Sequence, residues 1–310
     1  MVILFENPAL DEAREAGIAP APCDAREDAT IEGWDTSPTM YVAESYAADV
    51  VPWGLDGPRQ LRGGDRVTAG ITPRLGCEWN AEWLGAIDLA CRHQRDADRS
   101  WFHMPPLAVT GPCGAGRTHV ARRLAWEAGV AYIAIDVSGA AMVSGFGSPA
   151  RGPTPALPSA LAGAMSMTDC ANPIIGVTGV ETADADTLAR LSAAMDPMRS
   201  RIDDEGLGIT LDLSEATWLV QLPPDAALPP ELQDFTTTVA LTLPDQPDWV
   251  ELAWIEALIE VAADRATVGD LGRLADWTDG GAERWRNPNL GAAARYRLAM
   301  TAFDQVYGSG

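Results

Sequence analysis

The chain has 310 residues, 47% of them apolar and 21% charged, with a formal net charge of −22 and an isoelectric point near 4.3. This length suits about two domains, and the apolar share is enough to bury a sizeable core. So acidic a surface repels phosphate backbones, which argues against direct binding of nucleic acid. No apolar run is long enough to cross a bilayer, so we expect no membrane contact either.

All 22 basic residues are arginines, and the chain contains no lysine. Two interpretations stand: a genome rich in G and C that encodes arginine instead, or avoidance of modifications directed at lysine. The five cysteines are scattered without a C-x-x-C pair, which predicts reduced thiols rather than a disulfide framework or a zinc site. The N-terminus lacks the basic segment of a signal peptide, and together these features predict a cytoplasmic protein.

Residues 1–78 are rich in acidic residues and in proline and glycine, and we predict an N-terminal extension there. It contains two short candidate strands, around 40–42 and 50–53. The extension either docks on the core or reaches a neighbouring protein. From Asn80 to about Arg95, apolar residues recur at helical spacing, with Asn80 as a possible cap.

Residues 107–118 read Leu-Ala-Val-Thr-Gly-Pro-Cys-Gly-Ala-Gly-Arg-Thr, an apolar strand that leads into a glycine-rich loop and a helix start. The spacing is that of a Walker A phosphate loop, G-x-x-x-x-G-K-[ST], with Arg117 in the place of lysine. Such loops curl backbone N–H groups around an anion at a helix N-terminus. Arginine keeps the positive charge but is bulkier and planar, so the exchange is not conservative.

Beyond the loop, strands are predicted to alternate with helices. A helix from the loop to Ala128 stops at Gly129, and a long Gly/Ser/Pro-rich loop spans 139–158. This alternation predicts an α/β fold, with a parallel sheet covered by helices on both faces. The remaining predicted strands are 130–136, 173–180, 217–221 and 238–243, and the remaining predicted helices are 159–167, 184–195, 249–263, 268–277 and 290–307.

Several landmarks occur in the order in which AAA+ ATPases have them. They are the loop at 111–118, Asn172-Pro173, Leu191–Pro197, the acidic turn 203–205, Leu211–Ser214 and Leu228–Leu232. The chain therefore resembles the ATPase module of Lon-type proteases and its stand-alone bacterial relatives. The resemblance implies a P-loop AAA+ core with a five-stranded parallel sheet over 79–245, followed by a helical lid over 246–310.

The resemblance also implies a site for ATP or ADP with Mg²⁺, although a loop that binds no nucleotide stays an open alternative. Thr118 would hold the Mg²⁺. Arg295 would be the arginine that the lid contributes. The implied nucleotide-binding residues are Gly111, Gly114, Ala115, Gly116, Arg117, Thr118, His119 and Arg295.

Other positions depart from the AAA+ pattern. The acidic pair that ends the Walker B strand is matched by Thr178 and Gly179, with Glu181 as a possible stand-in for the catalytic glutamate. At the position of the sensor-one asparagine of AAA+ ATPases, the nearest side-chain amide is that of Gln221. The position of the arginine that acts in trans falls at about Phe235. An arginine finger alone is worth roughly 10³–10⁵ in rate, so these losses together predict turnover near background.

Three functions follow as hypotheses. The first is a hydrolysis-deficient AAA+ module that acts as a scaffold or regulatory subunit, in a homo-oligomer or with a protein partner. The second is an atypical ATP-dependent remodeller that uses Arg117 and Glu181. The third is an acidic inhibitor or decoy that occupies a basic partner. For Asp203, Asp204 and Glu205 we favour a solvated acidic turn over a metal cluster.

Overall fold

The computed structural model describes residues 38–46, 54–72, 75, 77–139, 158–246, 250, 253–254, 257, 295 and 297–301. The predicted strand at 50–53, nearly all of the predicted loop at 139–158 and most of the predicted tail helices lie outside these residues. The described residues of the tail that fall in helix are 250, 253–254, 257, 295 and 297–301.

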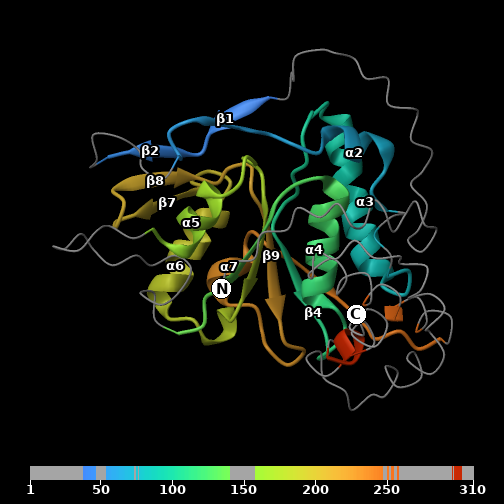
Figure 1. Cartoon of the computed structure of the whole chain (residues 1–310). Coiled ribbons are helices and arrows are strands. Elements are labelled where there is room, and N and C mark those ends of the chain that lie inside the picture. The colour runs from blue at the N-terminus through green and yellow to red at the C-terminus, as the bar shows by residue number, and fades with distance from the viewer. Residues whose placement is uncertain are drawn as a thin grey trace, which may run out of the picture.

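A five-stranded sheet of parallel strands forms the centre of the fold, as the alternation of strands and helices predicts (Figure 1). Its spatial order is β10-β4-β9-β6-β5, so β9 lies between the strand that leads into the phosphate loop and β6. The predicted strand at 173–180 ends early, because Gly179 turns the chain with a φ of 83°. The five strands are β4 (Leu107–Thr110), β5 (Tyr132–Asp136), β6 (Ile174–Thr178), β9 (Thr217–Leu222) and β10 (Thr237–Ala240).

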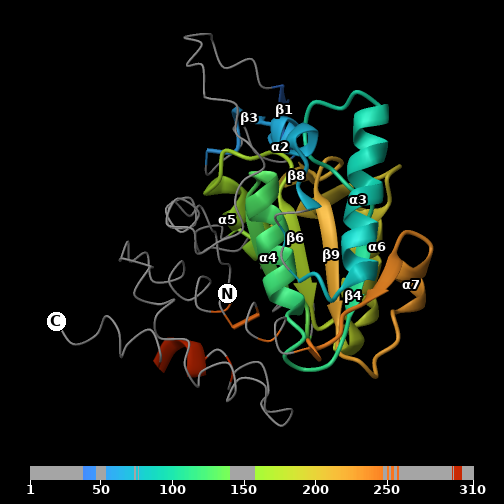
Figure 2. The same cartoon turned by 90° about the vertical axis from the view of Figure 1, so that its right-hand side faces the viewer.

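Helices cover both faces of this sheet (Figures 1 and 2). On one face lie α2 (Gly64–Ala69), α3 (Ala81–Asp96) and α4 (Arg117–Ala128), and on the other lie α5 (Ala160–Ser166), α6 (Ala185–Met195) and α7 (Pro230–Gln233). Successive strand residues point to opposite faces, so Trp218 and Val220 join one core while Leu219 joins the other. The helices α2 and α7 are additions to those that the sequence predicts.

A three-stranded antiparallel sheet of order β2-β8-β7 was not predicted. The prediction of a solvated acidic turn at 203–205 is correct for Glu205, which is exposed at the start of the turn, and wrong for Asp204, which lies in β7 and is only 1% exposed; Asp203 is exposed but also lies in β7. The strands are β2 (Ala43–Ser45), β7 (Arg201–Asp204) and β8 (Ile209–Asp212), and β1 (Thr39–Tyr41) pairs separately with β3 (Pro58–Gln60).

The described residues of the predicted extension pack into the two cores. Val42, Leu55 and Leu61 join the core beneath α5 and α6, whereas Val67 and Ile71 join the core beneath α3 and α4. These described parts of 1–78 therefore dock on the 79–245 body, which is the first of the two alternatives for this segment.

Asn172, one of the landmark residues, connects three segments. Its Oδ1 accepts the Arg62 backbone N–H at 2.9 Å, and its Nδ2 donates to the carbonyls of Arg62 (2.9 Å) and Phe102 (2.7 Å). The residue is fully buried. Because these bonds tie the segments before β4 and β6 together, they fix how the two strands enter the sheet.

Within the described residues, helices of the length and apolarity needed to cross a bilayer are absent.

Candidate functional site

The phosphate loop (residues 111–118) connects β4 to α4 as the motif predicts. Gly114 and Gly116 have φ values of 90° and 87°, which lie in the left-handed region that favours glycine. Helix α4 begins at Arg117 with no side-chain cap. The first N–H groups of a helix have no intrahelical acceptor, so this helix start presents its donors to the space in front of the loop.

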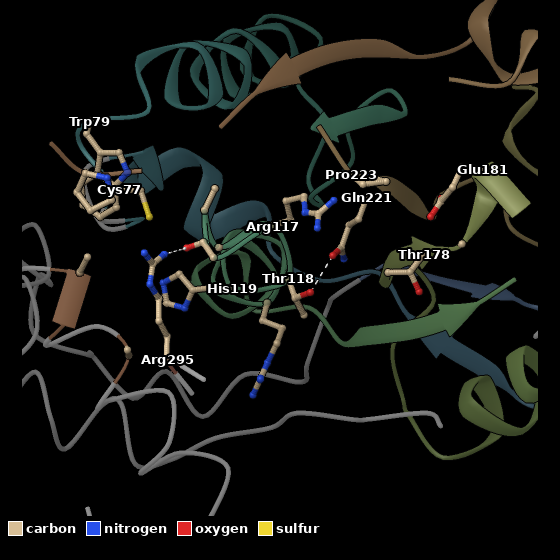
Figure 3. A pocket seen from close by; sticks show the side chains of 18 residues that line it. Cys77, Trp79, Arg117, Thr118, His119, Thr178, Glu181, Gln221, Pro223 and Arg295 are labelled. Carbon is tan, nitrogen blue, oxygen red and sulfur yellow. Dashed lines mark hydrogen bonds between the residues drawn. The ribbon is translucent and has the colours of Figure 1, made fainter. Parts of the chain in front are cut away.

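A cavity of about 440 Å³ lies in front of this loop and is called the loop cavity below. Figure 3 shows Trp79 and Cys77 at one end, Thr178 and Glu181 at the other, and Thr118 and Gln221 between them. Its described lining residues are Cys77, Trp79, Gly114–His119, Arg122, Thr178, Gly179, Glu181, Gln221, Pro223, Pro244, Ala253, Ala257 and Arg295.

Seven of the eight residues expected to bind nucleotide line the loop cavity. The exception is Gly111, which packs against Leu241 at the end of β10: a Cβ at position 111 would lie 2.7 Å from the Leu241 carbonyl oxygen. Gly111 therefore allows β4 and the segment after β10 to approach each other, and it shapes the loop without reaching the cavity. Phe235 follows α7 and does not belong to the described lining.

The cavity is locally cationic although the chain is acidic. Three arginines line it, Arg117, Arg122 and Arg295, against the single carboxylate of Glu181 among the described lining residues. With His119 neutral, these side chains sum to a formal charge of +2 (three minus one), whereas the whole chain carries −22. A local field of this sign attracts anions.

Thr118, Gln221 and Tyr132 form a chain of hydrogen bonds across the floor of the site. The Thr118 hydroxyl donates to Gln221 Oε1 at 2.8 Å, and Gln221 Nε2 donates to the Tyr132 hydroxyl oxygen at 3.2 Å. Gln221 and Tyr132 are 5% and 2% exposed. The Tyr132 ring lies against the backbone of Gly176, where no Cβ would fit. The Gln221 amide is thereby held at both ends.

The end of β6 brings no carboxylate to the loop. Thr178 stands in register with Gln221 on β9, and its hydroxyl donates to the Ile135 carbonyl at 3.4 Å. Gly179 follows with its left-handed backbone. Glu181 lies in a 3-10 turn, η2 (Val180–Thr182), where it is exposed and lines the cavity.

Arg295, from the C-terminal segment, reaches the loop as the resemblance implies. Its Nη1 donates to the Gly114 carbonyl at 3.1 Å (Figure 3), and the residue is only 5% exposed. Burial lowers the pKa of this guanidinium, while the neighbouring Cys113 acts to raise it. The contact joins the tail to the loop across 181 residues of sequence.

Sequence reasoning missed three lining residues of the cavity, Cys77, Trp79 and Pro244, and the buried partner Tyr132. Trp79 donates its indole N–H to the Thr242 carbonyl at 3.1 Å, which ties it to the segment after β10. A tryptophan just before α3 carries no local signal of this role, because its position depends on a contact 163 residues away.

A scan of the chain against protein-family models gives no match, and no curated protein matches it.

Proposed function

We propose that this chain is a degenerate AAA+ module that binds a nucleotide in the loop cavity, does not hydrolyse it, and serves as a scaffold or regulatory subunit. The observation that carries the proposal is the combination of a formed phosphate loop with a β6 end that has no carboxylate. The described helical residues of the tail, with Arg295 on the loop, support the lid that the resemblance implies.

Two features support nucleotide binding. The cavity volume lies within the range of about 300–1,000 Å³ common for small-molecule sites. The cavity also holds aromatic and apolar groups together with groups that bind anions: Trp79 and Cys77 lie at one end, and the backbone donors of the loop and three arginines line the same cavity. An aromatic base and a polyphosphate need both kinds of group.

The residues at β6 support the loss of hydrolysis. Hydrolysis of a phosphoanhydride requires a group that orients the attacking water and groups that neutralise developing charge. A hydroxyl at Thr178 and a glycine at 179 supply neither a base nor a metal ligand of the usual strength. A bound but uncleaved nucleotide then acts as a structural element that joins loop and tail.

Glu181 favours a second candidate, a slow ATPase. Its carboxylate lines the cavity in the turn directly after β6, two residues beyond the glutamate position. In this case Glu181 would orient water, and Arg117 would contact the phosphates.

Calorimetric titration with ATP, combined with a turnover assay, tests both candidates. Binding should weaken at least tenfold in Arg117→Ala and stay unchanged in Arg92→Ala, which removes an exposed arginine of α3 paired only with Asp88 among the described ion pairs. Turnover should stay at background in all three proteins. Failure of the unaltered chain to bind millimolar ATP would contradict the proposal, and turnover that Glu181→Gln abolishes would establish the second candidate instead.

A further inference from the structure

The donor set around Thr118 does not fit the Mg²⁺ that the AAA+ resemblance implies. Mg²⁺ demands near-octahedral oxygen ligands at about 2.0–2.1 Å and is usually held through one or two carboxylates. Here the Thr118 hydroxyl donates its proton to an amide oxygen, Gln221 Oε1, at 2.8 Å. The described residues contain no group of three or more His, Cys, Asp or Glu side chains able to hold a metal ion.

The nearest strand ends offer the metal nothing better. Thr178 turns its hydroxyl toward the Ile135 carbonyl, and Gly179 has no side chain. Asp136, at the end of β5, accepts the Ser138 backbone N–H at 2.9 Å and does not belong to the described lining of the cavity. Glu181, the one lining carboxylate of the described set, lies beyond Gln221 as seen from Thr118 (Figure 3).

Gln221 is held in the position between the loop and β6 by more than its bond to Thr118. It is buried in a strand whose six residues are all buried, and its Nε2 donates to the buried Tyr132 hydroxyl. Moving the amide aside for a metal would leave both Thr118 and Tyr132 without this partner. Leaving a buried polar group unpaired destabilises the protein.

The arginines supply the positive charge that a metal would otherwise bring. Arg117, Arg122 and Arg295 converge on the cavity from the loop, from α4 and from the tail. Guanidinium groups hold phosphate oxygens through paired N–H donors, and they stay protonated at any physiological pH. The three arginines therefore offset part of the charge of a polyphosphate without a metal.

We propose that the loop cavity takes its nucleoside polyphosphate in the metal-free form, with the Gln221 amide in the place of Mg²⁺ and the three arginines as counter-charges. This inference rests on the proposed nucleotide binding. Substitution of Gln221 by glutamate would place a carboxylate beside the Thr118 hydroxyl and so restore part of a metal site.

The experiment is a calorimetric titration of the full chain with ATP, for the unaltered protein and for Gln221→Glu. Each protein is titrated once in excess MgCl₂ and once in excess EDTA. An MgCl₂ concentration of about 5 mM converts ATP to its Mg²⁺ complex by mass action. For the unaltered protein we expect dissociation constants within threefold of each other. For Gln221→Glu we expect binding at least tenfold tighter with Mg²⁺ than with EDTA.

If Mg²⁺ tightens ATP binding by the unaltered protein tenfold or more, the inference is overturned and the proposed function stays intact. If the ratio of the dissociation constants with EDTA and with Mg²⁺ is the same for the unaltered protein and for Gln221→Glu, the role given to Gln221 is overturned. Absence of ATP binding in both buffers, with a normal unfolding transition as the folding control, would overturn the proposed function and the inference with it. Tyr132→Phe keeps the ring against Gly176 and removes only the hydroxyl. For this variant, as for the unaltered protein, we expect the dissociation constants with Mg²⁺ and with EDTA to stay within threefold of each other.

Discussion

Gly114 lies where the phosphate loop meets the tail. Its carbonyl accepts the Arg295 guanidinium, and a Cβ at this position would overlap that guanidinium. Gly70, at the end of α2, has the same φ of 90° but nothing within 4 Å of its would-be Cβ. The two glycines therefore share a positive φ and differ in their surroundings.

We predict that Gly114→Ala destabilises the protein by about 1 kcal/mol more than Gly70→Ala does. Both alanines pay the strain of positive φ, but only the one at 114 displaces a hydrogen bond from a charged, buried group, a bond worth about 1.5–3 kcal/mol. Urea unfolding measures both free energies. In an Arg295→Ala background the two substitutions should cost the same, and a persistent difference would show that Arg295 is not its cause.

At this scale the sequence predicted which residues form the loop, because glycine spacing is a local signal. That these residues and Arg295 bind nucleotide stays a prediction. The sequence did not predict the partners of Thr118 and Gln221, since Thr118 lies on α4 and Tyr132 lies on β5, which β6 separates from the strand of Gln221. Tyr132 is also 89 residues from Gln221 in sequence.

The hairpin of β7 and β8 is connected to α5 through one carboxylate. Asp204 Oδ2 accepts the Ser159 backbone N–H at the start of α5 (2.8 Å), and Oδ1 accepts the Leu207 N–H inside the hairpin turn (3.0 Å). Its neighbour Asp203 is exposed and accepts the Thr210 hydroxyl on the surface. Two adjacent aspartates thus hold very different positions.

We expect Asp204→Ala to lower the free energy of unfolding by about 2–4 kcal/mol, because it leaves two buried backbone donors without this acceptor. Asp203→Ala should cost less than about 1 kcal/mol, as most surface changes do. Urea unfolding of the two variants measures the contrast. Equal costs would contradict the connecting role of Asp204.

The strands β4, β5, β6 and β9 were predictable because each is a short, mostly buried and mostly apolar run between turn residues. The hairpin was not, because β7 reads Arg-Ile-Asp-Asp, and only Ile202 and Asp204 turn inward. A buried aspartate reverses the rule that charged residues mark the exposed face. The register of β8 with β2 also depends on a contact far away in sequence.

Over the whole molecule, negative charge is the dominant feature. A net charge of −22 on 310 residues creates repulsion within the compact state. Salt screens such charges, since the Debye length is about 10 Å at 0.1 M. The cationic loop cavity is a local exception, which gives an anion a favourable destination.

We predict that raising NaCl from about 0.02 to 0.3 M increases the melting temperature by about 2 °C or more, which for a domain of this size corresponds to roughly 1 kcal/mol. Differential scanning calorimetry measures the shift. Arg117→Ala should show the same increase, which separates general screening from chloride bound at the loop. A melting temperature that falls with salt would mean that attractive ion pairs outweigh the repulsion.

The contact between Tyr132 and Gly176 has a consequence for evolution. Because the tyrosine ring fills the space where any side chain at 176 would stand, the two positions are constrained to change together. A homologue with alanine or a larger residue at 176 must carry a smaller residue at 132, and its residue at 221 then loses the hydroxyl partner. Substitutions at 132, 176 and 221 should therefore co-vary, even though Gly176 does not belong to the described lining of the loop cavity.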